Sequence, residues 1–232
     1  MSGAGPARAG AGTGVRRGRF VTLEGLEGVG KTTNLAAVVD TLRARGIEPL
    51  VTREPGGTPL GERLRRTVLH DGFEMLPRTE LLLVAAARLE HVARTIEPAL
   101  AAGTWVVSDR YLDSSVAYQG GGRGLGAEEV IDLHRRLGLT LVPDLTLLLD
   151  VPVAEGRSRS RERGEPDRIE AEGIAFFERA RRTFLERAAA EPGRVAVIDA
   201  GAPLERVTRA VAARVAALVD AHDEPGDRGG QA

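Results

Sequence analysis

Residues 25–32 read G-L-E-G-V-G-K-T, and this stretch decides the fold. It matches the pattern of a phosphate-binding loop, in which two glycines enclose four residues and are followed by lysine and then serine or threonine. An apolar run, Phe20–Leu23, precedes the loop, and Lys31–Arg45 follows it with leucine and valine at helical spacing. A strand, this loop and a helix, in that order, predict a P-loop that binds the phosphates of a nucleoside triphosphate.

The residues of the loop have distinct predicted roles. Its glycines let the backbone bend until the N–H groups face the phosphates. Lys31 is predicted to bridge the β- and γ-phosphates, and the Thr32 hydroxyl to bind Mg²⁺. The predicted ATP-binding residues of the loop are Gly25, Leu26, Glu27, Gly28, Val29, Gly30, Lys31, Thr32 and Thr33. The alternative, a chance glycine turn, leaves the lysine and threonine at this offset without an explanation.

The rest of the chain alternates short apolar runs with longer helical patterns, which is typical of β-α-β units and a parallel sheet. The further predicted strands are Pro49–Thr52, Trp105–Ser108, Leu145–Leu149 and Val195–Ile198. The further predicted helices are Arg78–Ala102, Ala127–Leu137 and Leu204–Val219. The sequence therefore predicts an α/β fold in which helices flank a five-stranded parallel sheet in three layers, as in P-loop kinases.

Length and composition limit the remaining possibilities. The 232 residues suit one domain, predicted at 19–220, between disordered tails at 1–18 and 221–232. The chain has no cysteine, which excludes disulfides and thiolate metal sites. Its net charge of -1 gives no general attraction to nucleic acid or to an anionic membrane. With no apolar run of membrane-spanning length or signal-peptide character, we expect a cytoplasmic protein without either partner.

Charged motifs follow the predicted strands at their carboxyl ends, where open α/β sheets bind ligands. Arg53 and Glu54 follow the second strand, and Asp109 and Arg110 follow the third. The carboxylate of Glu27, inside the loop, would repel ATP phosphates unless it faces something else, and we expect it to face an acceptor sugar. These motifs favour an anion pocket opposite the P-loop, which a switch NTPase does not need.

Three further strings resemble bacterial thymidylate kinase: T-R-E-P-G-G-T-P-L-G at 52–61, D-R-Y-L-D-S-S-V-A-Y-Q-G-G-G-R-G at 109–124, and D-R-I-E at 167–170. The resemblance runs from about residue 20 to about residue 219. It implies that ATP phosphorylates dTMP with Mg²⁺ as cofactor, for dTTP synthesis, and that the chain forms a homodimer. A kinase for another nucleoside monophosphate and a P-loop NTPase switch remain as alternatives.

The resemblance also implies a role for individual residues. Arg65 and Arg110 would hold the dTMP phosphate, while Asp109 would help Thr32 to arrange Mg²⁺. Tyr118 would crowd the sugar's 2′ position, and Glu27 would lie near its 3′-hydroxyl with Glu54 beside it. The implied substrate-binding residues are Glu27, Arg53, Glu54, Arg65, Arg88, Arg110, Ser115, Tyr118 and Gln119, of which Arg88, Ser115 and Gln119 would read the thymine edge. Val84 stands where family members usually stack a phenylalanine on the thymine ring.

An arginine-rich segment, 155–168, reads E-G-R-S-R-S-R-E-R-G-E-P-D-R, and we expect it to form a small mobile lid over ATP. Phosphoryl transfer needs a cation on the transferred group. Some thymidylate kinases place an arginine directly after the P-loop acid, where this chain has Gly28. The resemblance therefore implies a lid arginine, Arg163, supported by Arg159, Arg161 and Arg168, which would also bind ATP. The predicted catalytic residues are Lys31, Asp109, Arg110 and Arg163, and no histidine is among them.

Overall fold

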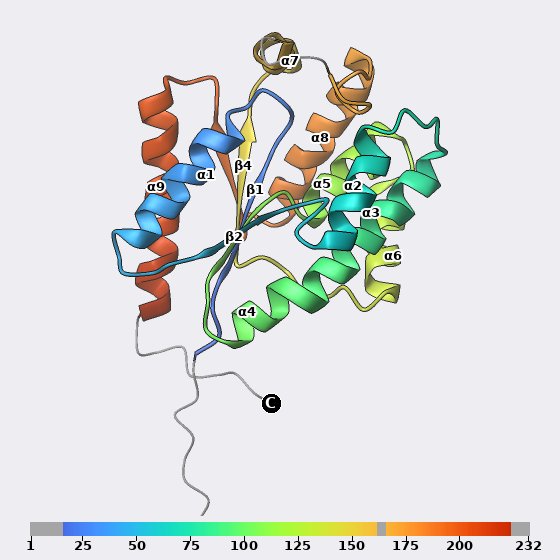
Figure 1. Ribbon diagram of the computed structural model, residues 1–232. Helices are drawn as coiled ribbons and strands as arrows, with labels where there is room; N and C mark the ends of the chain where they lie inside the picture. The colour runs from blue at the N-terminus through green and yellow to red at the C-terminus, as the bar shows by residue number, and fades with distance from the viewer. Residues whose placement is uncertain (1–15, 162–165, 224–232) are drawn as a thin grey trace, which may run out of the picture.

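A five-stranded parallel sheet forms the centre of the molecule (Figure 1). The computed structural model describes residues 16–161 and 166–223. The strand order is β2-β3-β1-β4-β5. The strands are β1 (Phe20–Glu24), β2 (Leu50–Arg53), β3 (Val106–Asp109), β4 (Leu145–Asp150) and β5 (Val195–Asp199). Every predicted strand is present within one residue at each end, and the predicted three-layer α/β fold is confirmed.

The strand register brings the functional motifs to one edge of the sheet. Leu23 of β1 pairs with Asp109 of β3, and Asp109 also pairs with Arg53 of β2. All three strands therefore end at the same level, and the chain leaves each of them at the carboxyl edge. The P-loop, Glu54 and Arg110 follow directly from these strand ends. The central position of β1, whose five residues are all buried, fixes the P-loop in the middle of that edge.

Helices cover both faces of the sheet. In Figure 1, α1 and α9 lie together on one face, whereas α8 and the group around α2, α3, α5 and α6 lie on the other. The helix α7 lies beyond the P-loop end of the sheet. The helices are α1 (Lys31–Arg43), α2 (Pro59–Leu69), α3 (Pro77–His91), η1 (Val92–Ile96), α4 (Glu97–Ala101), α5 (Leu112–Ser115), η2 (Val116–Gly122), α6 (Ala127–Arg136), α7 (Val153–Arg161), α8 (Ile174–Ala190) and α9 (Leu204–Asp223).

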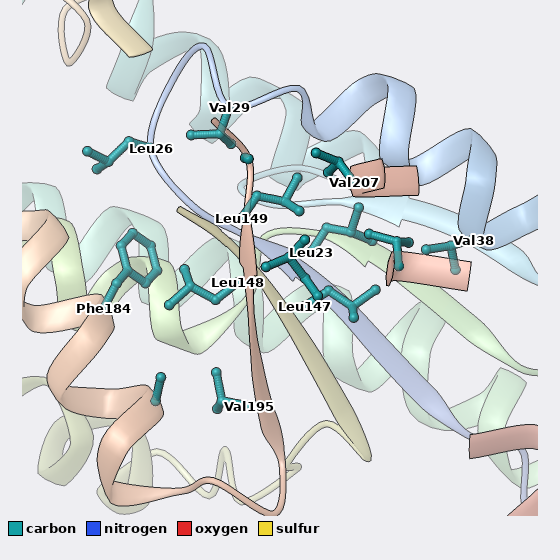
Figure 2. Packing of buried hydrophobic residues seen from close by; sticks show 14 of the residues in the cluster. Leu23, Leu26, Val29, Val38, Leu147, Leu148, Leu149, Phe184, Val195 and Val207 are labelled. Carbon is teal, nitrogen blue, oxygen red and sulfur yellow. The ribbon is translucent and has the colours of Figure 1, made fainter. Parts of the chain in front are cut away.

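The core is built from alternate faces of the central strands. Leu148 of β4 points towards Phe184 of α8, whereas Leu147 and Leu149 point to the face that carries Val38 of α1 and Val207 of α9 (Figure 2). Successive strand residues point to opposite faces, so a strand covered on both sides reads as a continuous apolar run. Each of these leucines is at most 2% exposed, and truncating one to alanine would cost about 2–5 kcal/mol.

The helix predicted over Arg78–Ala102 is present but contains a wide turn. Its regular part, α3, passes into the π-helical η1 and then into α4 without leaving the helical axis. Pro98 lies in the first turn of α4, where it has no N–H to donate and its ring would collide with the carbonyl four residues earlier. The wide turn at η1 precedes that proline and accommodates it.

One long helix was not predicted from the sequence, and the end of another was predicted too early. The helix α8 was not predicted, although its aromatic residues Phe176, Phe177 and Phe184 are all buried. The helix α9 continues to Asp223, four residues beyond its predicted end at Val219. In this last turn His222 packs on Trp105 with ring centroids 5.4 Å apart, and its Nδ1 accepts from Arg19 Nε at 3.0 Å. Most of both predicted tails lies outside the described residues.

Within residues 16–161 and 166–223, no helix is long and apolar enough to cross a membrane.

Candidate active site

The P-loop has the backbone conformation that its glycines permit. Gly25, Gly28 and Gly30 have φ angles of 133°, 77° and 86°, a region that residues with a Cβ rarely adopt. At Gly28 a Cβ would also lie 1.9 Å from the carbonyl oxygen of Gly156, in α7. The loop therefore packs directly on the backbone of α7, and no side chain fits at position 28.

Lys31 lies inside the curve of the loop. Its Nζ donates to the carbonyl oxygens of Leu26 at 2.8 Å and Gly25 at 3.2 Å. Burial, together with the neighbouring guanidinium of Arg110, lowers the pKa of Lys31 to about 8. Both partners of the Lys31 ammonium group are neutral carbonyl oxygens. A triphosphate in the loop would give it anionic partners, so the geometry suits an anionic ligand.

A cavity of about 270 Å³ opens beside the P-loop, and it collects most of the predicted site residues. The predicted residues that line it are Glu27, Gly28, Gly30, Lys31, Thr32, Glu54, Arg65, Arg88, Asp109, Arg110, Ser115, Tyr118 and Gln119. The other lining residues include Val68 and Leu69 of α2, Val84 of α3, and Asp167, Ile169 and Glu170 of the D-R-I-E segment. Arg53 is not in the lining: its exposed side chain donates to Glu62 Oε2 at 2.8 Å.

The side chain of Glu27 lines the cavity and points away from the interior of the P-loop. Its Oε1 accepts from Arg110 Nη2 at 2.9 Å and from the Tyr118 hydroxyl at 2.9 Å. Arg110 also donates to Gly25 O at 2.8 Å, and its guanidinium carbon lies 5.0 Å from the centroid of the Tyr118 ring. The acid of the P-loop is therefore held by the two side chains that come from the D-R-Y motif and the helix η2.

Asp109 meets the requirements of a magnesium ligand. Its Oδ1 is buried, and no group in the described part of the chain donates a hydrogen bond to it. Thr32 lines the same cavity. Residues 16–161 and 166–223 contain no group of three or more His, Cys, Asp and Glu side chains that could hold a metal. One carboxylate and one hydroxyl suit Mg²⁺, which usually takes one or two protein ligands and completes its shell with phosphates and water.

Arg65 supplies positive charge without a carboxylate partner. Its Nη1 donates to the Pro55 carbonyl oxygen at 3.0 Å, and no described acid lies within ion-pair distance. Burial, followed by the guanidiniums of Arg53 and Arg110, lowers the pKa of Arg65. The positive charges of Arg53 and Arg110 disfavour the charged form of Arg65, and the same three charges together attract a phosphate.

Arg88 is buried at the opposite end of the cavity, with 2% of its surface exposed. Its Nε donates to Glu54 Oε2 at 2.6 Å, Nη1 to Ser115 Oγ at 3.0 Å, and Nη2 to the Tyr111 carbonyl oxygen at 2.9 Å. Nη1 also contacts His134 Nε2 at 2.7 Å. Four of the five N–H groups of the guanidinium are thus engaged within the described residues, and one on Nη2 is left for a ligand.

Two histidines support this buried network, and the sequence analysis gave neither of them a role. His91 Nδ1 lies 3.0 Å from Glu54 Oε1, and its Nε2 lies 2.7 Å from Thr52 Oγ1. His134 Nε2 must accept from Arg88, because arginine has no acceptor, so Nδ1 carries the proton that is donated to Val130 O at 2.7 Å. Burial and the charge of Arg88 lower the pKa of His134 to about 4, which keeps the ring neutral.

An apolar wall closes the cavity beside Arg88. Val84 packs with Val68 and Leu69 of α2, and Ile169 covers this cluster from the D-R-I-E segment. The side chain of Val84 is 6% exposed and lines the cavity. The wall is therefore aliphatic at Val84, the position where members of the resembling family usually carry a phenylalanine.

The arginines predicted to act from the lid segment, 155–168, are placed differently from one another. Arg159 donates to the Ala200 carbonyl oxygen at 3.0 Å and pairs with Glu155. Arg168 donates to Val68 O at 2.7 Å and to Glu80 Oε2 at 2.6 Å, a position that gives no support to its predicted ATP contact. Arg163 and the side chain of Arg161 lie outside the described residues.

The comparisons with known proteins agree with this arrangement. The family model described as thymidylate kinase matches residues 23–211. A thymidylate kinase of Pseudomonas fluorescens (strain SBW25) is 51% identical over 204 residues, covering 88% of this chain and 97% of the relative. One from Methylococcus capsulatus (strain Bath) is 52% identical over 206 residues, covering 88% and 98%, and one from Bordetella petrii is 49% identical over 204 residues, with the same coverage. A match of this extent, on a P-loop that faces an arginine-lined cavity, shows that the chain belongs to the thymidylate kinase family.

Proposed function

We propose that the cavity binds dTMP opposite ATP and that the chain transfers the γ-phosphoryl group between them. The observation that carries this function is the continuity of one cavity from Lys31 and Thr32 to Arg88 and Gln119. A triphosphate in the P-loop and a nucleoside monophosphate in the cavity would meet at Asp109 and Arg110. The relatives named thymidylate kinase support the choice of dTMP.

On the donor side, the P-loop amides and Lys31 hold the triphosphate. Lys31 exchanges its contacts with Gly25 O and Leu26 O for phosphate oxygens. Asp109 and Thr32 would hold Mg²⁺, which neutralises charge on the phosphates when it is bound.

On the acceptor side, Arg65 and Arg110 hold the monophosphate. Arg110 already fixes the acid of the P-loop, so it also sets the distance between the two substrates. The acceptor phosphate is largely a dianion at neutral pH, so it needs no strong general base. Positioning of the two phosphates therefore accounts for most of the catalysis, as is usual for phosphoryl transfer.

The nucleoside occupies the other end of the cavity. Glu27 and Tyr118 face its sugar, and Tyr118 blocks a 2′-hydroxyl. The free N–H of Arg88, the hydroxyl of Ser115 and the amide of Gln119 face the polar edge of the base, while Val84 and Ile169 cover its ring. We assign Glu54 a supporting role, because its carboxylate is occupied by Arg88 and His91.

The lid supplies the cation for the transferred group. No side chain fits at position 28 of the P-loop, which leaves the arginines at the end of α7 and directly after it as the source. Arg163 is our choice, with Arg161 in support.

The assembly is a homodimer that resides in the cytoplasm and binds no nucleic acid. Support for the dimer comes from the exposed side of α3, where the large apolar side chains of Leu82 and Leu89 are 55% and 41% exposed. Support for the absence of a nucleic-acid partner comes from the net charge of -1.

The test is an acceptor assay with ATP, Mg²⁺ and each of dTMP, dUMP, CMP, GMP and AMP. We expect dTDP to form fastest. A different diphosphate formed in preference to dTDP would contradict the assignment of dTMP, and ATP hydrolysis that no monophosphate alters would indicate a switch protein.

A further inference from the structure

The carboxylate of Glu80, in α3, joins three segments of the chain. It accepts from Gln119 Nε2 at 2.8 Å, from Arg123 Nε at 3.1 Å and from Arg168 Nη2 at 2.6 Å. Its donors come from η2, from the turn that follows η2 and from the D-R-I-E segment. Glu80 is 0% exposed and does not itself line the cavity, whereas Gln119 does. Glu80 therefore lies directly behind Gln119, a side chain that lines the cavity.

Glu80 is ionised. Burial raises the pKa of a carboxyl group, but here the hydrogen bond from Gln119 and the guanidiniums of Arg123 and Arg168 outweigh that effect and hold the pKa of Glu80 below its ordinary value. An ionised carboxylate accepts hydrogen bonds and cannot donate them. Every group that binds Glu80 must therefore present an N–H or O–H to it.

This requirement fixes the orientation of the Gln119 amide. An amide can present either its NH₂ group or its carbonyl oxygen to a neighbour, and the hydrogen-bond network decides between them. Glu80 accepts only the NH₂ end. The carbonyl oxygen, Oε1, receives no hydrogen bond from any described residue, although Gln119 is only 3% exposed and lines the cavity. Gln119 therefore offers a hydrogen-bond acceptor to whatever lies in the cavity.

We infer that Glu80 is a positioning residue for base specificity, which locks Gln119 so that its carbonyl oxygen faces the base. This inference rests on the proposed function, in which Gln119 contacts the base. Thymine and uracil carry a hydrogen at N3 and can donate to that oxygen, whereas N3 of cytosine is an acceptor. A cytosine in the same place would leave two acceptors facing each other at a side chain that is only 3% exposed, and unpaired buried polar groups of this kind are strongly unfavourable.

The test is Glu80→Gln, measured by the preference for dUMP over dCMP. These two nucleotides lack the 5-methyl group and differ only on the polar edge of the base. The neutral amide of the variant can donate or accept, so Gln119 can turn over. We expect the ratio of the two inhibition constants, measured against dTMP phosphorylation, to fall by about 10- to 100-fold relative to wild type. The same ratio in folded E80Q would overturn the inference.

Glu172→Gln is the matched control. Glu172 also pairs with Arg123, so its replacement removes one carboxylate from the same arginine. Among the described contacts it has none with Gln119. We expect the ratio of inhibition constants in E172Q to stay within about twofold of wild type, because the loss of a partly exposed ion pair has only a small effect. If E172Q lost as much of the dUMP preference as E80Q, the inference would be overturned, because the loss of one ion pair to Arg123 would then explain both results.

If circular dichroism shows that E80Q does not fold, Gln119→Met decides. It removes the oxygen while it keeps Glu80, and the dUMP preference should fall as in E80Q; an unchanged preference would overturn the inference. Wild-type protein that does not phosphorylate dTMP would contradict the proposed function itself. Wild-type protein that does so, with a variant that keeps the full preference, contradicts only the role of Glu80.

Discussion

The hydroxyl of Tyr118 lies 2.9 Å from Oε1 and 3.0 Å from Oε2 of Glu27, so one phenol joins η2 to the P-loop. Its ring packs against Phe176 and Phe184 independently of that bond. Tyr118→Phe should therefore fold normally but leave Glu27 held by Arg110 alone. We expect the KM for dTMP to rise about tenfold, the equivalent of one charged hydrogen bond, with a smaller change in kcat.

The control for this variant is Tyr111→Phe, at a second buried tyrosine, whose ring packs on Phe20. In steady-state kinetics, the KM for dTMP should rise in Tyr118→Phe and stay near the wild-type value in Tyr111→Phe. A KM for dTMP that stays at the wild-type value in Tyr118→Phe would show that the bond to Glu27 does not position the acceptor.

Gly28→Ala should abolish ATP binding, because its Cβ would lie 1.9 Å from Gly156 O. Gly46→Ala is a matched control: both glycines have a φ of 77°, but a Cβ at position 46 meets nothing within 4 Å. Both variants carry the same left-handed strain, about 1 kcal/mol. Calorimetric titration with ATP should show binding in Gly46→Ala only. Equal binding in both would mean that α7 moves aside without cost.

Asp109→Asn should weaken the response to Mg²⁺, because Oδ1 of Asp109 is buried and has no partner in the described chain. We expect the Mg²⁺ concentration for half-maximal activity to rise about tenfold or more. Asp150→Asn, at the end of β4, is the control, because Asp150 is bound by Arg181 at 2.8 Å. It should cost some stability without a change in the Mg²⁺ dependence. A shift in that dependence for Asp150→Asn and none for Asp109→Asn would reverse the assignment.

The neutral state of His134 makes stability depend on pH. Burial and Arg88 lower its pKa from 6.5 to about 4, so between these values the unfolded state binds more protons than the folded state. The free energy of unfolding should therefore fall as the pH falls through this window, by about 3 kcal/mol at its lower end. Urea denaturation at several pH values checks this. His134→Gln keeps an acceptor for Arg88 and should flatten the dependence, and an unchanged slope would assign it to other groups.

Arg163→Ala tests the proposal that a lid arginine supplies the catalytic cation. An arginine that contacts only the transferred group in the transition state should lower kcat by about 10³-fold and leave the Kd for ATP nearly unchanged. Arg159→Ala, whose guanidinium is bound to Ala200 O and Glu155, should have the smaller effect on kcat. Equal losses in kcat and in ATP affinity for Arg163→Ala would identify it as a binding residue.

The sheet and the strand-end residues were predictable from the sequence because both depend on local patterns. Leu147–Leu149 form an apolar run that only a doubly covered strand explains, and Asp109 follows a strand that had to end near the P-loop. The residues behind the site were not predictable. Glu80 looks like any acid in the first turn of a helix, and only the folded chain brings it to Gln119.

The histidines show the same limit in another way. His91 lies one turn from Arg88 on the same helix, so the helical spacing could have suggested that the two side chains lie near each other. His134 reaches Arg88 from a different helix, 46 residues later, and no spacing in the sequence relates the two. α8 was missed because its apolar residues alternate with many arginines and glutamates, although the aromatic ones are buried.

The contact between the P-loop and α7 also limits how this enzyme can be recombined with its relatives. A Cβ at Gly28 meets Gly156 O, and a Cβ at Gly156 would lie 2.8 Å from Glu27 O, so the two glycines guard the same contact from opposite sides. A P-loop taken from a thymidylate kinase with arginine at the position of Gly28 would collide with α7, unless the helix that replaces α7 were transferred together with it. The P-loop and α7 therefore have to be exchanged together, although more than a hundred residues of sequence separate them.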